Sequence, residues 1–319
     1  MPILGGDMVL KKSARIVIRD CLGIKKGERV IIITDRFCRE IGIALWEELP
    51  DRSASFLIEI APTGGHGREP PLLIAEVLKK CDAFIIPTSY SLTHTQARIQ
   101  ATNAGIRGAT MPGITADVMA RTLNADYRRI ARLTQKIERL LSQAKSVIIR
   151  TFNNAELYLD ISQRDGHPDT GIIKTPGSFS NLPAGEAYCA PLEDKSEGKV
   201  VIDGSFAPVG LLKRPVSLEI ESGKIKKIVG NKTLEKIFDQ AGEKGRILCE
   251  LGIGTNYKAK ITGNVLEDEK VMGTVHIAFG NNLGFGGKND AKIHLDGVIK
   301  NPTLLLDGRK IIERGKILI

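Results

Sequence analysis

The sequence predicts an N-terminal doubly wound α/β domain over residues 1–145, followed by a β-rich α+β domain over residues 146–319. The chain has 319 residues, and domains usually contain about 100–200, so two are expected. In the first half, helix-like segments alternate with short apolar runs, which is typical of βαβ units around a parallel sheet. After residue 145, short strand-like segments are separated by Gly, Asn, Pro and Asp turns.

The elements of the first domain follow from the spacing of its apolar residues. Residues 7–23 have helical spacing, and the β-branched run 30–34 has the pattern of a buried parallel strand. The segments expected next are helix 41–49, strand 55–61, helix 71–80, strand 83–87, helix 95–104 and strand 108–113. Thr115 is a candidate N-cap for the following helix, and residues 126–144 form one long amphipathic helix.

The second domain is expected to contain mainly strands. The predicted strands cover 147–150, 156–162, 200–204, 216–221, 224–229 and 247–251, with one helix at 233–242. Gly198-Lys199 and Ser222-Gly223 have the composition of hairpin turns between such strands.

Composition excludes several classes of protein. No apolar run approaches the roughly 18–20 residues of a membrane span, and residues 1–7 lack the pattern of a secretory signal, so a cytoplasmic protein without a membrane partner is expected. The five scattered cysteines include no CxxC pair, which argues against a disulfide framework or a zinc ribbon. The net charge is +9, but aromatic residues make up only 5% and no RNA-binding aromatic motif is present, which argues against nucleic acid.

Histidines and carboxylates in apolar surroundings predict a metal site. In a strand, residues two apart share a face, so His294 and Asp296 would present a nitrogen and an oxygen donor to one point. His276 lies in another apolar run, and Glu186 and Glu250 sit where a charge is costly unless it is paired or metal-bound. Salt bridges remain the alternative for each carboxylate. Together the five residues would suit two divalent ions that activate a water molecule.

Two nearby segments are less specific. The acidic run 267–269 is expected to be solvated, although Glu269 is a candidate general base. The glycine-rich segment 281–289 lacks the Lys-Ser/Thr of a P-loop and is interpreted as a flexible connection.

At these residues the sequence resembles the thermophilic metallo-aminopeptidases, the family named after aminopeptidase T. The matching pieces are the Glu before an aromatic and Ala-Pro (residues 185–191), the Glu after a strand (248–254), the Asp-Glu pair at 268–269, the His-Ile-Ala run (276–280) and the His-x-Asp of 294–296. Order and approximate spacing match over residues 180–300.

The resemblance implies a metal-dependent hydrolase that removes N-terminal residues from small peptides and forms a homodimer. It implies two zinc or cobalt ions held by the five donors: Glu186, Glu250, His276, His294 and Asp296. The family tyrosine seven residues after the first histidine is replaced here by Leu283, so metal binding carries over better than peptidase activity.

A related family provides the alternative. The iron-dependent dihydroxypyridine dioxygenases resemble the same scaffold and use a mononuclear Fe(II) site of one Glu, one His and one Asp, which Glu250, His294 and Asp296 would satisfy. That family also uses a histidine of the first domain. Here His94 is the candidate catalytic residue, with Arg98 one helical turn on, and a helix-capping or surface histidine is the alternative.

Overall fold

The computed structural model describes residues 4–319, which form two compact units. The first unit comprises the chain up to Ala131 together with Thr170–Ala184. The second comprises Arg132–Asp169 and Gly185–Ile319. The division therefore falls inside a helix and is discontinuous, whereas the sequence suggests a single boundary near residue 145. Residues 1–3, part of the segment tested for a secretory signal, lie outside the described residues.

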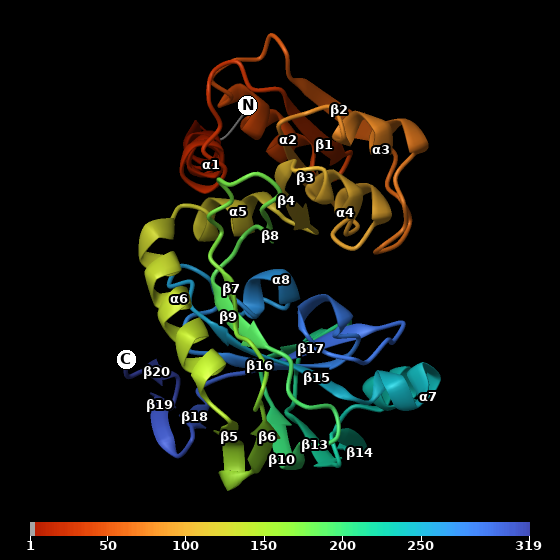
Figure 1. Ribbon diagram of the computed structural model, residues 1–319, viewed down its shortest axis with the longest axis vertical. Helices are drawn as coiled ribbons and strands as arrows, with labels where there is room; N and C mark the ends of the chain where they lie inside the picture. The colour runs from red at the N-terminus through yellow and green to blue at the C-terminus, as the bar shows by residue number, and fades with distance from the viewer. Residues whose placement is uncertain (1–3) are drawn as a thin grey trace. The chain divides into compact units, whose positions relative to one another are not determined.

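The first unit alternates helices with parallel strands, and most of the predicted elements are present (Figure 1). The helix predicted at 7–23 is an α-helix whose last turn widens into a π-helical one, and Thr115 caps its helix by accepting a hydrogen bond from the Val118 N–H at 3.2 Å. The elements are α1 (Leu4–Ile16), η1 (Val17–Cys21), β1 (Val30–Asp35), α2 (Arg39–Glu47), β2 (Phe56–Ile60), α3 (Leu72–Leu78), β3 (Ala83–Thr88), α4 (Gln96–Asn103), β4 (Arg107–Pro112), α5 (Ala116–Thr122), the start of α6 (Tyr127–Gln143), and β8 (Phe179–Asn181).

Sheet A of this unit is doubly wound, which confirms the predicted class. Its order is β2-β1-β3-β4-β8, and every pairing is parallel. Ile31 and Ile33 of β1 pack in one core with residues of α3 and α4, while Thr34 on the opposite face meets Gly42 of α2. Helices thus cover both faces, and the fully buried strand β1 explains its uninterrupted apolar run.

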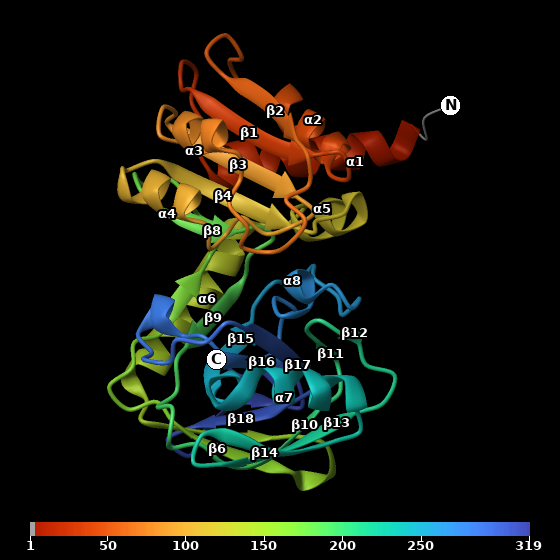
Figure 2. The ribbon, with the colours of Figure 1, turned by 90° about the vertical axis from the view of Figure 1, so that its right-hand side faces the viewer.

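The second unit contains two antiparallel sheets. Sheet B has the order β14-β13-β10-β6-β5-β18-β19-β20, and sheet C has the order β12-β11-β17-β16-β15-β9-β7. Figure 2 shows strands of the two sheets as separate layers. The elements are the rest of α6, β5 (Ser146–Arg150), η2 (Phe152–Asn154), β6 (Glu156–Asp160), β7 (His167–Asp169), β9 (Glu186–Cys189), β10 (Glu197–Ile202), β11 (Ser205–Phe206), β12 (Gly210–Leu211), β13 (Val216–Glu221), β14 (Lys224–Val229), α7 (Lys232–Gly245), β15 (Leu248–Gly254), α8 (Val265–Asp268), β16 (Val275–Gly280), η3 (Leu283–Phe285), β17 (His294–Ile299), β18 (Thr303–Leu306), β19 (Arg309–Glu313) and β20 (Lys316–Ile317).

Sheet C has one apolar and one polar face. Ile277 and Phe279 of β16 enter a core that also contains residues of sheet B, α6 and α7. Because side chains alternate along a strand, His276 and Ala278 point away from that core. The same alternation places polar side chains of β9, β15 and β17 on this second face, which therefore carries the candidate site.

Two local predictions have opposite outcomes. Ser222-Gly223 is a hairpin turn as predicted, with positive φ at both residues between β13 and β14. The turn predicted at Gly198-Lys199 is wrong, because both residues lie inside β10 and pair with β13.

Two predictions from composition can be compared with the structure. All five cysteines are buried and free. Over residues 4–319 no helix is long and apolar enough to cross a membrane.

Candidate metal centre

Four neighbouring strands of sheet C bring the predicted donors together. In the order β9-β15-β16-β17, Glu186 pairs with Gly254, and Ala278 lies between Glu250 on one side and Asp296 on the other. His294 lies two residues before Asp296 on β17. The β-sheet register therefore gathers residues that are more than a hundred positions apart in the chain.

His276 can join this group because its cross-strand neighbour is a glycine. Gly252 of β15 pairs with His276 of β16, and a Cβ built on Gly252 would lie 2.1 Å from the imidazole Cε1 and Nε2 atoms. Any side chain at position 252 would take the space of the ring. The glycine thus permits the imidazole to lie flat against the strand, which nothing in the sequence pattern revealed.

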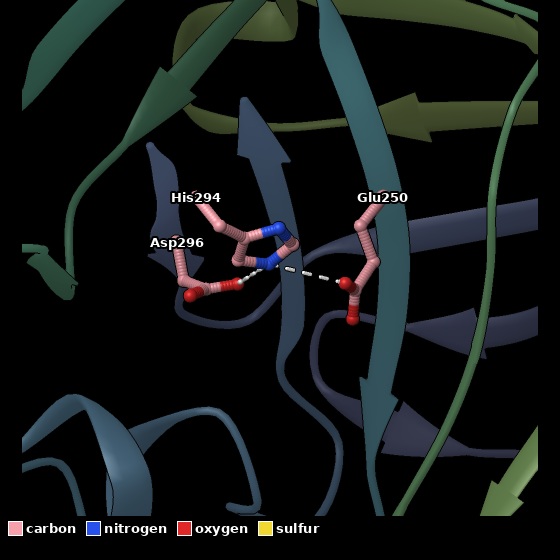
Figure 3. Close-up of side chains that lie close together, drawn as sticks. All are labelled: Glu250, His294 and Asp296. Atoms are coloured by element: carbon pink, nitrogen blue, oxygen red, sulfur yellow. Dashed lines mark ion pairs between the residues drawn. The ribbon is translucent and has the colours of Figure 1, made fainter. Parts of the chain in front are cut away.

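His294 lies between two carboxylates (Figure 3). Its Nε2 is 3.2 Å from Glu250 Oε2 and 3.4 Å from Asp296 Oδ1. Its Nδ1 lies 2.8 Å from the Asn281 carbonyl, which can only accept, so Nδ1 carries a hydrogen. This contact orients Nε2 toward the carboxylates, which is the usual arrangement around a metal-binding histidine.

The second histidine is sealed inside the protein. The His276 side chain is 1% exposed against 32% for His294, and its Nε2 lies 3.3 Å from Glu186 Oε2 and 3.4 Å from Glu250 Oε1. Within the part of the chain that the structure describes, both ring nitrogens and Glu186 Oε2 lack a hydrogen-bond partner. Buried polar atoms are normally satisfied, so these atoms fit a site built to face a cation.

The donors fall into two sets of the right size for a divalent ion. Glu250, His294 and Asp296 form one, and Glu269, His276 and Asp296 form the other, with the ligand atoms of each set within 4.8 Å of one another. Asp296 belongs to both. Imidazole nitrogen combined with carboxylate oxygen suits iron, zinc or manganese.

The electrostatics of the cluster favour positive charge. Burial lowers the pKa of His276, but the surrounding carboxylates, with Glu250 foremost, outweigh it and raise the pKa to about 9. Asp296 likewise outweighs burial and raises the pKa of His294. Burial would raise the pKa of Glu250, yet the two imidazoles hold it below its ordinary value.

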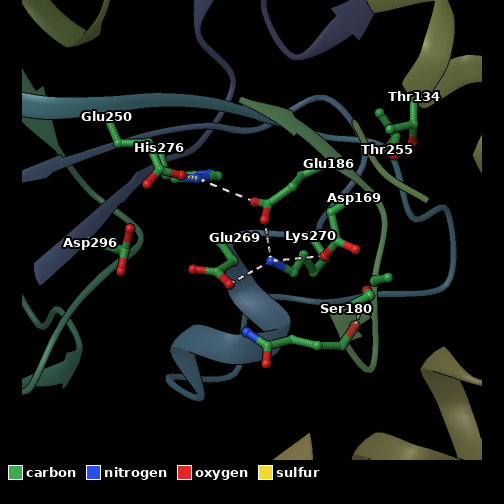
Figure 4. A network of polar contacts seen from close by, with 12 residues as sticks. Thr134, Asp169, Ser180, Glu186, Glu250, Thr255, Glu269, Lys270, His276 and Asp296 are labelled. Atoms are coloured by element: carbon green, nitrogen blue, oxygen red, sulfur yellow. Dashed lines mark hydrogen bonds and ion pairs between the residues drawn. The ribbon is translucent and has the colours of Figure 1, made fainter. Parts of the chain in front are cut away.

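The cluster also contains a buried lysine, Lys270, that the sequence pattern did not predict. The Lys270 side chain is 2% exposed, and its ammonium lies 2.5 Å from Glu186 Oε1, 2.6 Å from Glu269 Oε1 and 3.8 Å from Asp169 Oδ2 (Figure 4). Along the chain Lys270 only follows an acidic run, which resembles a solvated surface. Its contacts depend on strands β7 and β9, which the sequence pattern did not reveal.

The acidic run itself is not solvated, so that prediction is wrong. Glu267 and Asp268 are fully buried. Glu267 accepts a hydrogen bond from the Lys260 N–H, and Asp268 accepts from those of Thr262 and Gly263. The carboxylates satisfy a turn whose backbone donors would otherwise be unpaired.

Glu269 is the member of the run that faces the donors. It belongs to the set with His276 and Asp296, and burial raises its pKa to about 8 even though Lys270 opposes the shift. His94 belongs to the first unit, exposed in the segment between β3 and α4. Its predicted catalytic role stays a prediction.

An aromatic cluster adjoins the donors. The Phe285 ring lies edge-on to His294 at 6.2 Å and to Tyr188 at 5.4 Å, and Tyr188 lies 5.5 Å from His167 between ring centroids. Phe285 belongs to η3, in the segment interpreted from sequence as a flexible connection.

The two-unit fold has known structural relatives. The structure of 2,5-dihydroxypyridine dioxygenase from Pseudomonas putida KT2440 matches with a TM-score of 0.80 at 20% identity, covering 98% of this chain and 97% of that one. AmpT from Thermus thermophilus matches with a TM-score of 0.71 at 17% identity, covering 98% and 99%.

The family is set by the sequence comparisons. The model of the 2,5-dihydroxypyridine 5,6-dioxygenase family (NicX) matches residues 61–319, and the chain belongs to that family. The 2,5-dihydroxypyridine 5,6-dioxygenase of Pseudomonas putida KT2440 is 27% identical over 257 residues, which cover 74% of this chain and 71% of the relative. Membership implies a metal cofactor, and the donor set described above fits one.

These findings overturn the main functional prediction. The interpretation as a hydrolase, and specifically as a zinc or cobalt metallo-aminopeptidase acting on peptides, is wrong, because the family match and the curated relative are both dioxygenases. The similarity to AmpT supports the shared fold only. The sequence motifs identified the shared fold, and the family is the one given as the alternative in the sequence analysis.

Proposed function

We propose that this protein is a mononuclear Fe(II) dioxygenase that opens the ring of a dihydroxypyridine or a closely related hydroxylated heteroaromatic compound. The observation that carries the proposal is the donor set around His294, on a chain whose family and curated relative are 2,5-dihydroxypyridine 5,6-dioxygenases. Glu250, His294 and Asp296 would hold the iron. When bound, iron supplies the binding of dioxygen and of a ring hydroxyl at a single centre.

The protein's own groups supply orientation and proton transfer. The Asn281 carbonyl holds the His294 ring through its Nδ1–H, so Nε2 keeps its lone pair for the ion. We assign Glu269 to accept the proton of a ring hydroxyl, because it shares a donor set with Asp296. His94 is retained as a second candidate for proton transfer.

The aromatic cluster suits a flat substrate. Phe285 lies beside His294, and Tyr188 lies against Phe285. Aromatic side chains can pack against a heteroaromatic ring, whereas a peptide backbone would gain little from them. A ring stacked there would exclude water from the half-exposed side of the donor cluster.

The test is oxygen consumption by protein loaded anaerobically with Fe(II). With 2,5-dihydroxypyridine, we expect one O₂ consumed per molecule of substrate and a ring-opened product heavier by two oxygen atoms. Asp296→Asn should abolish turnover and weaken iron binding at least tenfold, while Glu221→Gln, an exposed carboxylate at the end of β13, should change neither. If iron-loaded protein consumes no oxygen with any dihydroxypyridine isomer, the proposal fails.

The predicted homodimer is a separate matter. It stays a prediction, and the proposed reaction does not depend on it.

A further inference from the structure

Lys270 carries a positive charge beside the second donor set. Its ammonium touches Glu186 and Glu269 and approaches Asp169, and its side chain is 2% exposed. Glu269 is one of the three residues of the second donor set. One carboxylate oxygen of that set is therefore already paired with a cation of the protein.

The charge balance explains why such a cation is needed. Five carboxylates gather at this face of sheet C, four from its strands and one from the end of α8, and each side chain is at most 14% exposed: Asp169, Glu186, Glu250, Asp296 and Glu269. Buried carboxylates are costly unless they are paired or bind metal. A divalent ion in the first donor set neutralises the group around His294. The carboxylates farther along the sheet still need a cation, and Lys270 provides it.

We propose that Lys270 takes the place of a second metal ion and thereby limits the centre to one divalent cation. The ammonium pairs with one oxygen of Glu186 and one oxygen of Glu269, and its charge beside the second donor set opposes a second divalent ion. Only Glu250, His294 and Asp296 then hold metal. This inference rests on the proposed function only in assuming that the first donor set holds a metal ion. It would explain how a face with enough donors for two ions holds only one.

A purely structural ion pair would behave differently. If Lys270 only stabilised the fold, its loss would lower stability and leave the number of bound ions unchanged. If it replaces a metal ion, its loss creates a carboxylate-rich cavity next to His276, whose ring nitrogens lack hydrogen-bond partners among the described residues. Metal stoichiometry distinguishes the two roles.

The experiment titrates metal-free protein with Co(II) alone, by equilibrium dialysis with elemental analysis and by the visible absorption of the bound ion. Wild type should saturate at one Co(II) per chain. Lys270→Met keeps the length of the side chain and removes its charge, and it should saturate at two. Lys227→Met removes an exposed lysine of β14 in sheet B and should saturate at one.

Two outcomes overturn the inference: two ions in the wild type, or one ion in folded Lys270→Met. Lys270→Gln is the second neutral variant if the methionine does not fold. If neither variant folds, Glu269→Gln is the deciding variant. Because the proposal has Glu269 bound to Lys270 and not to metal, this substitution should change the dissociation constant for Co(II) less than threefold. A tenfold loss of Co(II) affinity contradicts the proposal. Failure to consume oxygen with dihydroxypyridines would refute the proposed function and leave this stoichiometry untouched.

Discussion

Replacing Gly252 by alanine tests whether the close approach of His276 to strand β15 builds the metal centre. The backbone φ of Gly252 is not in the left-handed region, so alanine brings no backbone strain of its own. The new methyl group would lie 2.1 Å from two ring atoms of His276, and ordinary contact begins near 3.4 Å. The imidazole must therefore move by about 1.3 Å, or the two strands must separate.

That displacement sets the expected size of the effect. His276 Nε2 lies 3.4 Å from Oε1 of the proposed ligand Glu250. The residues of a metal site and those that support them must be held within about 0.5 Å, so a ring moved by more than twice that distance no longer orients Glu250. We expect divalent-ion affinity to fall roughly 10- to 100-fold, as when a group that supports a metal ligand is lost. Forcing a methyl group into a packed site should also reduce the free energy of unfolding by about 1–3 kcal/mol.

The assay pairs a Co(II) titration with urea unfolding of the metal-free protein. Gly284→Ala is the matched control, because a Cβ at Gly284 meets nothing within 4 Å and its φ is not positive, so both measurements should stay at the wild-type values. Wild-type affinity and stability in Gly252→Ala would refute the steric argument. Reduced stability with unchanged affinity would show that His276 does not contribute to metal binding.

Three further predictions concern the core, pH and metal removal. Ile277→Ala should lower the free energy of unfolding by about 2–5 kcal/mol in urea, because Ile277 is fully buried between the sheets, whereas the exposed Leu211→Ala should cost little. Burial would raise the pKa of Glu28, but the Arg107 guanidinium 2.7 Å away lowers it. This stabilisation is fully present above 4.5, the ordinary pKa of a glutamate carboxyl, and is lost as the pH falls through the lower folded-state pKa, so Glu28→Gln should flatten the acid limb of stability against pH. Removing an ion present at a hundred times its dissociation constant should cost about 2.7 kcal/mol of unfolding free energy, and the same removal should cost Asp296→Asn about 1.4 kcal/mol or less, because its ion binds at least tenfold more weakly.

The first unit was predictable because its signals are local. Strand β1 is buried along its whole length, so its sequence is an apolar run that identifies it without knowledge of its neighbours. Strand β8 (Phe179–Asn181) was missed because it is short and half-buried. It joins sheet A beside β4, where Asn181 pairs with Thr110, a residue 71 positions earlier in the chain. A pairing at that separation leaves no periodic pattern in the sequence.

The candidate site was predictable in its residues but not in its arrangement. His294 and Asp296 share a face because of the two-residue period of a strand, which holds wherever the strand lies. The approach of His276 to Gly252 depends on the pairing of β15 with β16, and the segment 281–289 positions His294 through the Asn281 carbonyl. Neither contact follows from composition or local spacing.

The wrong choice of reaction has a physical origin. Five donors on one face are compatible with one metal ion or with two, so a motif made of those donors cannot distinguish the corresponding chemistries. What differs between the two cases is how the surplus negative charge is balanced. Here the pairing of Asp169 with Glu186 across β7 and β9, together with the position of Glu269, places three carboxylates around the Lys270 ammonium. Along the chain Lys270 is one more charged residue after α8, and only the sheet register turns it into a cation of the site. The number of metal ions per chain is therefore the measurement that connects the fold to the reaction.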